Sequence, residues 1–173
     1  MRSKFYRYYF LWLFVCLPLS VSAGPYWEVA PAFIALDTPA RSSRPLLVDF
    51  RIGDVFAGHH FEAAVMLGLT DHEVNQLTVE IPLVISVFYK YAPPIESSIK
   101  LHLIGGFSHV EVDSDYPGID KSTDKFDGFS YGFGFEEAFR KYPKTKISAD
   151  IIRLYHGEDI RINVVSLGVH YDF

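Results

Sequence analysis

Hydrophobic and polar residues alternate along most of this 173-residue chain with a period of two. The pattern is clearest at the C-terminal end, where apolar and small or polar residues take turns: Val165, Leu167, Val169, Tyr171 and Phe173 against Ser166, Gly168, His170 and Asp172. A period of two is that of a β-strand with one apolar and one polar face. The pattern therefore predicts an all-β protein.

Eight alternating segments follow residue 24. They cover about 26–36, 46–52, 60–69, 77–91, 99–112, 129–136, 146–155 and 160–173. Turn-forming or polar residues separate them, and the longest predicted loop covers 113–127. Within the fourth segment Pro82 has no amide hydrogen to donate, so we expect a local bulge or a missing ladder bond there. Val79 and Ile81 share the parity of Ile85 and are expected on the same face as that residue.

The apolar parity of these segments is rich in aromatic residues. In the sixth segment four aromatic side chains point one way, namely Phe129, Tyr131, Phe133 and Phe135. In water they would form an exposed apolar patch, whereas in a lipid bilayer they are an ordinary outer wall. Strands of about 9–11 residues, tilted, cross a bilayer core. We therefore predict an eight-stranded antiparallel up-and-down transmembrane β-barrel, whose interior is filled by side chains and leaves no aqueous channel.

The polar parity then points into the barrel and carries charges. Buried charges must be paired, so we predict an interior ion-pair network among these residues. Its predicted members are Glu28, Glu62, Glu80, Lys90, Lys100, His102, Glu136 and Asp150.

Residues 1–23 have the features of a cleaved secretory signal peptide. Arg2, Lys4 and Arg7 precede an apolar run that is too short to span a membrane, and Val21 and Ala23 suit the cleavage site. The domain would then be residues 24–173. That domain has 13 basic and 21 acidic residues, a net charge of −8 with histidines neutral, which argues against a nucleic-acid partner.

Three stretches resemble a known family: residues 103–110, residues 127–136 and residues 165–173. They are similar to the outer-membrane β-barrel domain family that includes the small OmpA-like and OmpX-like barrels. The resemblance implies a location in the outer membrane of a Gram-negative bacterium, with membrane lipids as partners. It also implies that both termini face the periplasm and that the connections at 37–45, 70–76, 113–127 and 156–159 face outside.

The last strand also resembles the C-terminal signal of bacterial outer-membrane barrels. The resembling residues are Ser166, Gly168, Tyr171 and Phe173. In that family the outer-membrane assembly machinery recognises this signal, so the resemblance implies the assembly machinery as a second partner.

Candidate reactive residues are few. His59 and His60 are adjacent, so in a strand they point to opposite faces and do not form a metal pair. The acidic loop 113–127 offers oxygens that suit Ca²⁺ but lacks the spacing of a calcium-binding loop. His156 lies where small lipid A deacylase barrels place a catalytic histidine, but the position of their serine nucleophile is Glu158 here. We expect no catalytic residue, no cofactor and no metal.

Three functional hypotheses follow. The first is a non-enzymatic outer-membrane barrel with a structural or surface-interaction role, whose extracellular ligand the sequence leaves unknown. The second is a small lipid-modifying outer-membrane enzyme, which requires a nucleophile and a base at the outer rim. The third is a soluble exported barrel that binds an apolar ligand inside, and the signal peptide together with Phe173 favours the first over it.

Overall fold

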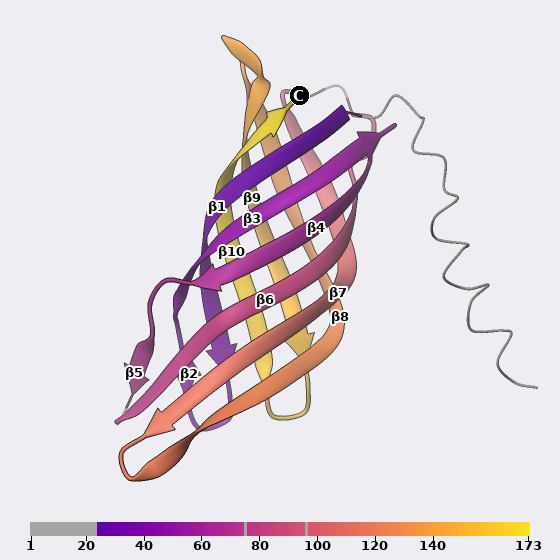
Figure 1. Ribbon diagram of the computed structural model, residues 1–173. Helices are drawn as coiled ribbons and strands as arrows, with labels where there is room; N and C mark the ends of the chain where they lie inside the picture. Colours follow the sequence, from indigo (N-terminus) through magenta and orange to yellow (C-terminus); the bar gives the residue numbers. More distant parts are fainter. Residues whose placement is uncertain (1–23, 75, 96) are drawn as a thin grey trace, which may run out of the picture.

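The computed structural model describes residues 24–74, 76–95 and 97–173, and strands make up its regular structure. Eight long antiparallel strands pair with their neighbours in sequence, and β10 pairs with β1 to close a barrel (Figure 1). They are β1 (Gly24–Asp37), β3 (Leu46–Phe56), β4 (His59–Gly68), β6 (Leu77–Tyr91), β7 (Ile99–Tyr116), β8 (Ile119–Phe139), β9 (Tyr142–His156) and β10 (Arg161–Asp172). The predicted eight-stranded up-and-down barrel is confirmed. Within the described ranges no helix is long and apolar enough to cross a membrane. The predicted signal peptide lies outside the described residues.

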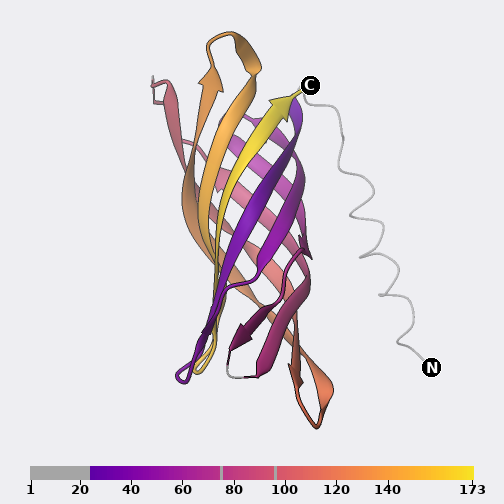
Figure 2. The same cartoon turned by 90° about the vertical axis from the view of Figure 1, so that its left-hand side faces the viewer.

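The two ends of the barrel differ. Gly24 and Phe173 lie at one end, which we call the terminal rim (Figure 2). The opposite end, the distal rim, carries the β1–β3, β4–β6, β7–β8 and β9–β10 connections. Two short strands, β2 (Ser42–Ser43) and β5 (His72–Val74), lie at the distal rim and extend the pairing of β1 and β6.

Apolar side chains cover the outside of the barrel in a continuous belt, which every long strand supplies. Examples are Phe33, Phe61, Leu103, Phe133 and Leu167, each more than half exposed. Such exposure is unfavourable in water and favourable in hydrocarbon, so this belt is the lipid-facing surface.

The belt ends sharply toward the distal rim. On β7 the belt ends with Phe107, and His109 follows it at the next outward position. On the neighbouring β8 the corresponding change falls between Phe129 and Asp127. Both strands continue well past this boundary, so their far parts project beyond the lipid.

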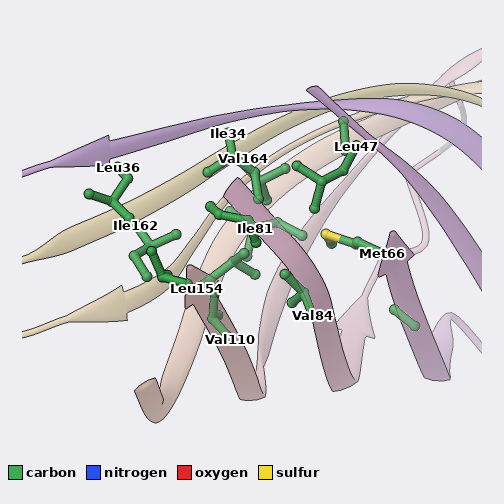
Figure 3. Packing of buried hydrophobic residues seen from close by; sticks show 14 of the residues in the cluster. Ile34, Leu36, Leu47, Met66, Ile81, Val84, Val110, Leu154, Ile162 and Val164 are labelled. Atoms are coloured by element: carbon green, nitrogen blue, oxygen red, sulfur yellow. The ribbon is translucent and has the colours of Figure 1, made fainter. Parts of the chain in front are cut away.

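The interior of the barrel has two zones. The distal zone is an apolar cluster that includes Ile34, Leu47, Met66, Ile81 and Leu154, all almost fully buried (Figure 3). The zone nearer the terminal rim is polar and charged, and is described below. Burying the apolar cluster removes methyl and methylene groups from water. This stabilises the folded barrel by about 25 cal/mol per Å² of apolar surface buried.

The structure corrects the predicted loop at 113–127. Instead, β7 and β8 stay paired up to Tyr116 and Ile119, with one register shift between Ser114 and Tyr116, so that Pro117 and Gly118 alone connect them. Gly118 has a φ of 84°, which a glycine adopts without steric cost. The many polar residues had suggested a loop. An antiparallel ladder, however, is held by backbone hydrogen bonds, so polar side chains are compatible with it where both faces of the hairpin are in contact with water.

The structure contains the bulge expected at Pro82. The register between β6 and β7 shifts between Glu80 and Leu83. The shift reverses the inward and outward parity of β6, so Val79 and Ile81 are buried inside the barrel. The prediction that they lie on the same face as Ile85 is therefore wrong. The extra residue in the bulge exchanges inward and outward positions, so residues on its two sides no longer share a face at a spacing of two.

Candidate functional site

Arg51 lies at the centre of the polar interior zone. It is fully buried, and its alternation with Phe50 and Ile52 on β3 turns it inward. Its Nε donates to Asp49 Oδ2 at 2.8 Å and its Nη2 donates to Ser166 Oγ at 3.1 Å. Its Nη1 forms an ion pair with Asp150 on the far wall. One guanidinium thus ties β3 to β9 and β10 across the barrel.

Lys90 is the second cation of this cluster. Its Nζ lies 2.8 Å from Glu62 Oε1 and 3.0 Å from Asp150 Oδ2. The other oxygen of Asp150 is 2.7 Å from His102 Nε2, and the hydroxyl of Tyr26 donates to Glu62 at 2.7 Å. Each group is at least nine-tenths buried.

The buried carboxylates outnumber the obligate cations. Glu28 accepts a hydrogen bond from Ser148 at 2.8 Å and lies 3.6 Å from His170 Nδ1. Together with Asp49, Glu62 and Asp150 it makes four buried acids against Arg51 and Lys90.

Most of the eight predicted interior residues come together. Glu28, Glu62, Lys90, His102 and Asp150 belong to the cluster around Arg51. Glu136 is buried closer to the terminal rim, and its Oε1 lies 3.5 Å from Lys146 Nζ.

The prediction is wrong for Glu80 and Lys100. Glu80 lies on the Pro82 bulge at the distal rim, 46% exposed and 3.6 Å from Lys121. Lys100 is exposed at the terminal rim, where β7 begins. A residue at a strand end or a bulge keeps its parity in the sequence but loses its place inside the barrel.

The predicted network left out His170 of β10 and, on β3, the two central members Asp49 and Arg51. Both alternate with Val48, Phe50 and Ile52, so the period-two pattern already carried the signal that they point inward.

The projecting part of β7 and β8, residues 109–127, forms an acidic hairpin beyond the lipid-facing belt. It carries six acidic residues and two lysines. Cross-strand pairs align it, with Lys125 Nζ 2.6 Å from Glu111 Oε1 and Lys121 Nζ 2.8 Å from Asp113 Oδ2. These ammonium groups hold the pKa values of both carboxyls below their usual range, and the carboxylates raise the pKa values of both lysines.

His109 lies at the base of the acidic hairpin, where it pairs with Asp127. Its Nδ1 is 2.7 Å from Asp127 Oδ1. This hydrogen bond raises the pKa of His109 above its ordinary value, and a second contact with Glu111 acts in the same direction.

The four residues of the resemblance at the last strand occupy two faces. Ser166 is buried and Gly168 faces inward, where a Cβ would come within 2.9 Å of the β1 backbone. Tyr171 faces outward with its ring 6.0 Å from that of Trp27, and Phe173 is exposed at the terminal rim. Backbone pairing of this strand with β1 closes the barrel, and the amide of Phe173 adds a hydrogen bond to β1 at 3.0 Å.

The other candidate residues do not converge. His59 lies at the terminal rim, 2.6 Å from the hydroxyl of Tyr89, whereas His60 points inward. His156 is exposed at the distal end of β9. Among the residues that the structure describes, no three histidine, cysteine or acidic side chains are placed to hold a metal ion together.

Comparison with known proteins identifies the fold. A family model described as outer membrane protein beta-barrel domain matches residues 41–173. The search of curated proteins gives no match. The structure of Ail, the attachment invasion locus protein of Yersinia pestis, is similar with a TM-score of 0.67 and 14% identity, over 88% of this chain and 100% of Ail.

Two further solved structures are similar in the same way. Neisserial surface protein A has a TM-score of 0.66 and 14% identity, over 86% of this chain and 97% of that protein. The outer membrane protein OprG of Pseudomonas aeruginosa has a TM-score of 0.58 and 10% identity, over 87% and 96%. At these identities the likeness concerns the fold.

Proposed function

The chain belongs to the outer membrane protein β-barrel domain family, and we propose that within this family it acts at the cell surface through its distal rim, without catalysing a reaction. It is a β-barrel protein of the Gram-negative outer membrane, as are the barrels it resembles.

The acidic hairpin carries the proposal. The lipid-facing belt ends at Phe107 and Phe129, and both strands continue to Tyr116 and Ile119. Nine further residues of β7, at about 3.3 Å each, give about 30 Å of projecting strand. In this family of barrels the longer connections are extracellular, so the acidic hairpin would stand outside the cell.

The filled interior argues against a transport role. The apolar cluster fills the distal zone of the interior, and the cluster around Arg51 fills the zone nearer the terminal rim. An eight-stranded barrel is only wide enough to be filled by side chains. A function at the surface therefore fits the barrel better than conduction through it.

The charge of the acidic hairpin indicates the kind of partner. Six acids against two lysines give it a net charge of −4 with His109 neutral. Complementary charge speeds and orients association, so a basic protein surface is the partner that fits. Ail has been solved in complex with the heparin analogue sucrose octasulfate, a polyanion. For the present chain we propose the opposite preference at this hairpin.

The sidedness of the barrel is tested by labelling single cysteines on intact cells. Residues 24–173 contain no cysteine, so each introduced thiol is unique in that part of the chain. A membrane-impermeant maleimide should label Asp120→Cys in the acidic hairpin but not Lys141→Cys in the β8–β9 turn. Labelling of Lys141→Cys alone would place the acidic hairpin in the periplasm and remove the basis of the proposal.

The partner preference is tested on purified barrel in lipid nanodiscs. The probes are lysozyme, a basic protein, and heparin. The triple variant Asp115→Asn, Asp120→Asn, Asp124→Asn should lose most lysozyme binding at 50 mM salt, whereas Asp54→Asn with Glu137→Gln, exposed at the terminal rim, should not. Equal lysozyme binding by all variants, or heparin binding that needs the intact hairpin, would contradict the proposal.

We further propose that residues 1–23 direct export and that the last strand directs assembly. Ser166, Gly168, Tyr171 and Phe173 match the expected signal, and β10 is the strand that closes the barrel on β1. Deleting Phe173 should lower the amount of protein that fractionates with the outer membrane and runs as a compact band on gels unless boiled. Deleting Arg140 from the β8–β9 turn is the matched control. Unchanged assembly without Phe173 would argue against the signal.

A further inference from the structure

A pocket of about 290 Å³ opens at the distal rim, beyond the lipid-facing belt. Its floor is apolar, with Leu36, Val79, Val112, Phe126 and Ile160 as the main contributors. Leu36, Val79 and Val112 belong to the apolar cluster of the barrel interior, so this pocket is the mouth of that cluster. Strands from both sides of the barrel and the β1–β3 connection thus build one concave surface.

One polar group in the wall of this pocket has no hydrogen-bond partner in the described part of the chain. Ser43, on the short strand β2, is fully buried and lines the pocket, and its Oγ makes no hydrogen bond to any residue within 24–74, 76–95 and 97–173. The neighbouring Ser42 differs, because its hydroxyl donates to Asp37 at 2.6 Å. A buried hydroxyl without a partner is destabilising, so such groups in native proteins usually have a role.

The charges at the pocket rim balance. Arg41 and Asp124 both line it, one from the β1–β3 connection and one from the acidic hairpin. A ligand with a strong net charge would be attracted by one of them and repelled by the other. An uncharged molecule is therefore favoured over a carboxylic acid or an amine.

We propose that this pocket binds a small uncharged molecule with an apolar body and one hydrogen-bonding group, which pairs with the Ser43 hydroxyl. Ligand sites in proteins are usually apolar with a few well-placed polar groups, and a pocket near 300 Å³ is at the small end of their range. The apolar body lies on Val79, Val112 and Phe126. The hydrogen bond fixes its orientation and gives the Ser43 hydroxyl a partner.

This inference rests on the proposed function only for the side of the membrane on which the pocket opens. Binding is measured with purified protein, whereas sidedness is measured on intact cells, so each can fail without the other.

The test is titration of the barrel in lipid nanodiscs with 1-naphthol, followed by NMR of isoleucine, leucine and valine methyl groups. Site-resolved signals separate binding from partition into lipid. Pocket methyls of Leu36, Val79 and Val112 should shift in a saturable manner, whereas those of lipid-facing Leu101 and Leu103 should not saturate.

Two variants report on the proposed contacts. Ser43→Ala should raise the dissociation constant about two- to tenfold, which is the range expected for the loss of one hydrogen bond. Val112→Phe fills the floor and should abolish saturable binding, while Ser122→Ala on the acidic hairpin, exposed to solvent, should leave binding unchanged. Heat-modifiable mobility on gels verifies that each variant is folded.

Non-saturable shifts only, or shifts confined to lipid-facing methyls, would overturn the proposal and leave water as the occupant. Equal affinity of Ser43→Ala and the parent protein would overturn it as well, because the orphaned hydroxyl is what distinguishes this pocket from a plain apolar recess.

Discussion

Replacement of Arg51 by methionine should be among the most damaging single changes in this barrel. The guanidinium contacts Asp49, Asp150 and Ser166, and it has Glu28 at 3.9 Å. Methionine has a similar length but no charge, so the cluster would keep four buried acids and only one obligate cation, Lys90. Removing one partner of a buried ion pair typically destabilises a protein by about 3–5 kcal/mol.

The loss is measurable by unfolding in urea. With a slope of about 2 kcal/mol per molar urea, a loss of about 3–5 kcal/mol lowers the unfolding midpoint by about 1.5–2.5 M. For this assay, protein beginning at residue 24 is to be refolded into short-chain lipid vesicles. Trp27 is the single tryptophan from residue 24 onward and lies in the lipid-facing belt, so its fluorescence reports folding.

A second variant separates charge from packing. Asp49 is fully buried, and among the described residues its ion pair is with Arg51. The double variant Arg51→Met, Asp49→Asn removes one uncompensated acid, so it should recover a substantial part of the lost stability. Arg161→Met, which changes an exposed arginine on β10, is the control and should shift the midpoint little.

Two results would refute this reasoning. One is an Arg51→Met variant within about 0.5 kcal/mol of the parent, the range typical of surface substitutions. The other is a double variant no more stable than Arg51→Met, which would mean that the loss comes from packing around the long side chain and not from unpaired charge.

Two further predictions concern the strand wall and the acidic hairpin. Gly106→Ala should destabilise the barrel by about 1–3 kcal/mol, because the new Cβ would collide with the backbone of Val87. In the control Gly105→Ala the new Cβ meets only the phenyl ring of Phe129 at 3.8 Å, so this variant should be neutral in the same urea assay. Equal effects of the two variants would contradict the packing argument. The raised pKa of His109 makes its pairing with Asp127 stabilising below the unfolded value of about 6.5, and this stabilisation is lost as pH rises through the folded pKa. NMR titration of the imidazole should show the pKa above the ordinary value and a drop toward it in Asp127→Asn; no change in that variant would assign the shift to another group.

The amino-acid sequence by itself determined the all-β class, the eight strands and the lipid-facing wall. These follow from one local property, the alternation of side chains along an extended backbone. Wherever a strand stays regular, parity decides which face a side chain occupies, so Glu28, Lys90, His102 and Asp150 were placed inside from the sequence alone.

Only the tertiary structure decided which inward residues meet and where the regular strands deviate. Arg51 and Asp150 are 99 residues apart and touch because the barrel closes, a relation set by shear and register that no local pattern contains. The bulge at Pro82 reversed the parity of β6, and cross-strand pairing turned residues 113–127 into a hairpin. The pocket beside Ser43 likewise depends on segments from several strands, since its floor and its orphaned hydroxyl come from parts of the chain that are distant in sequence.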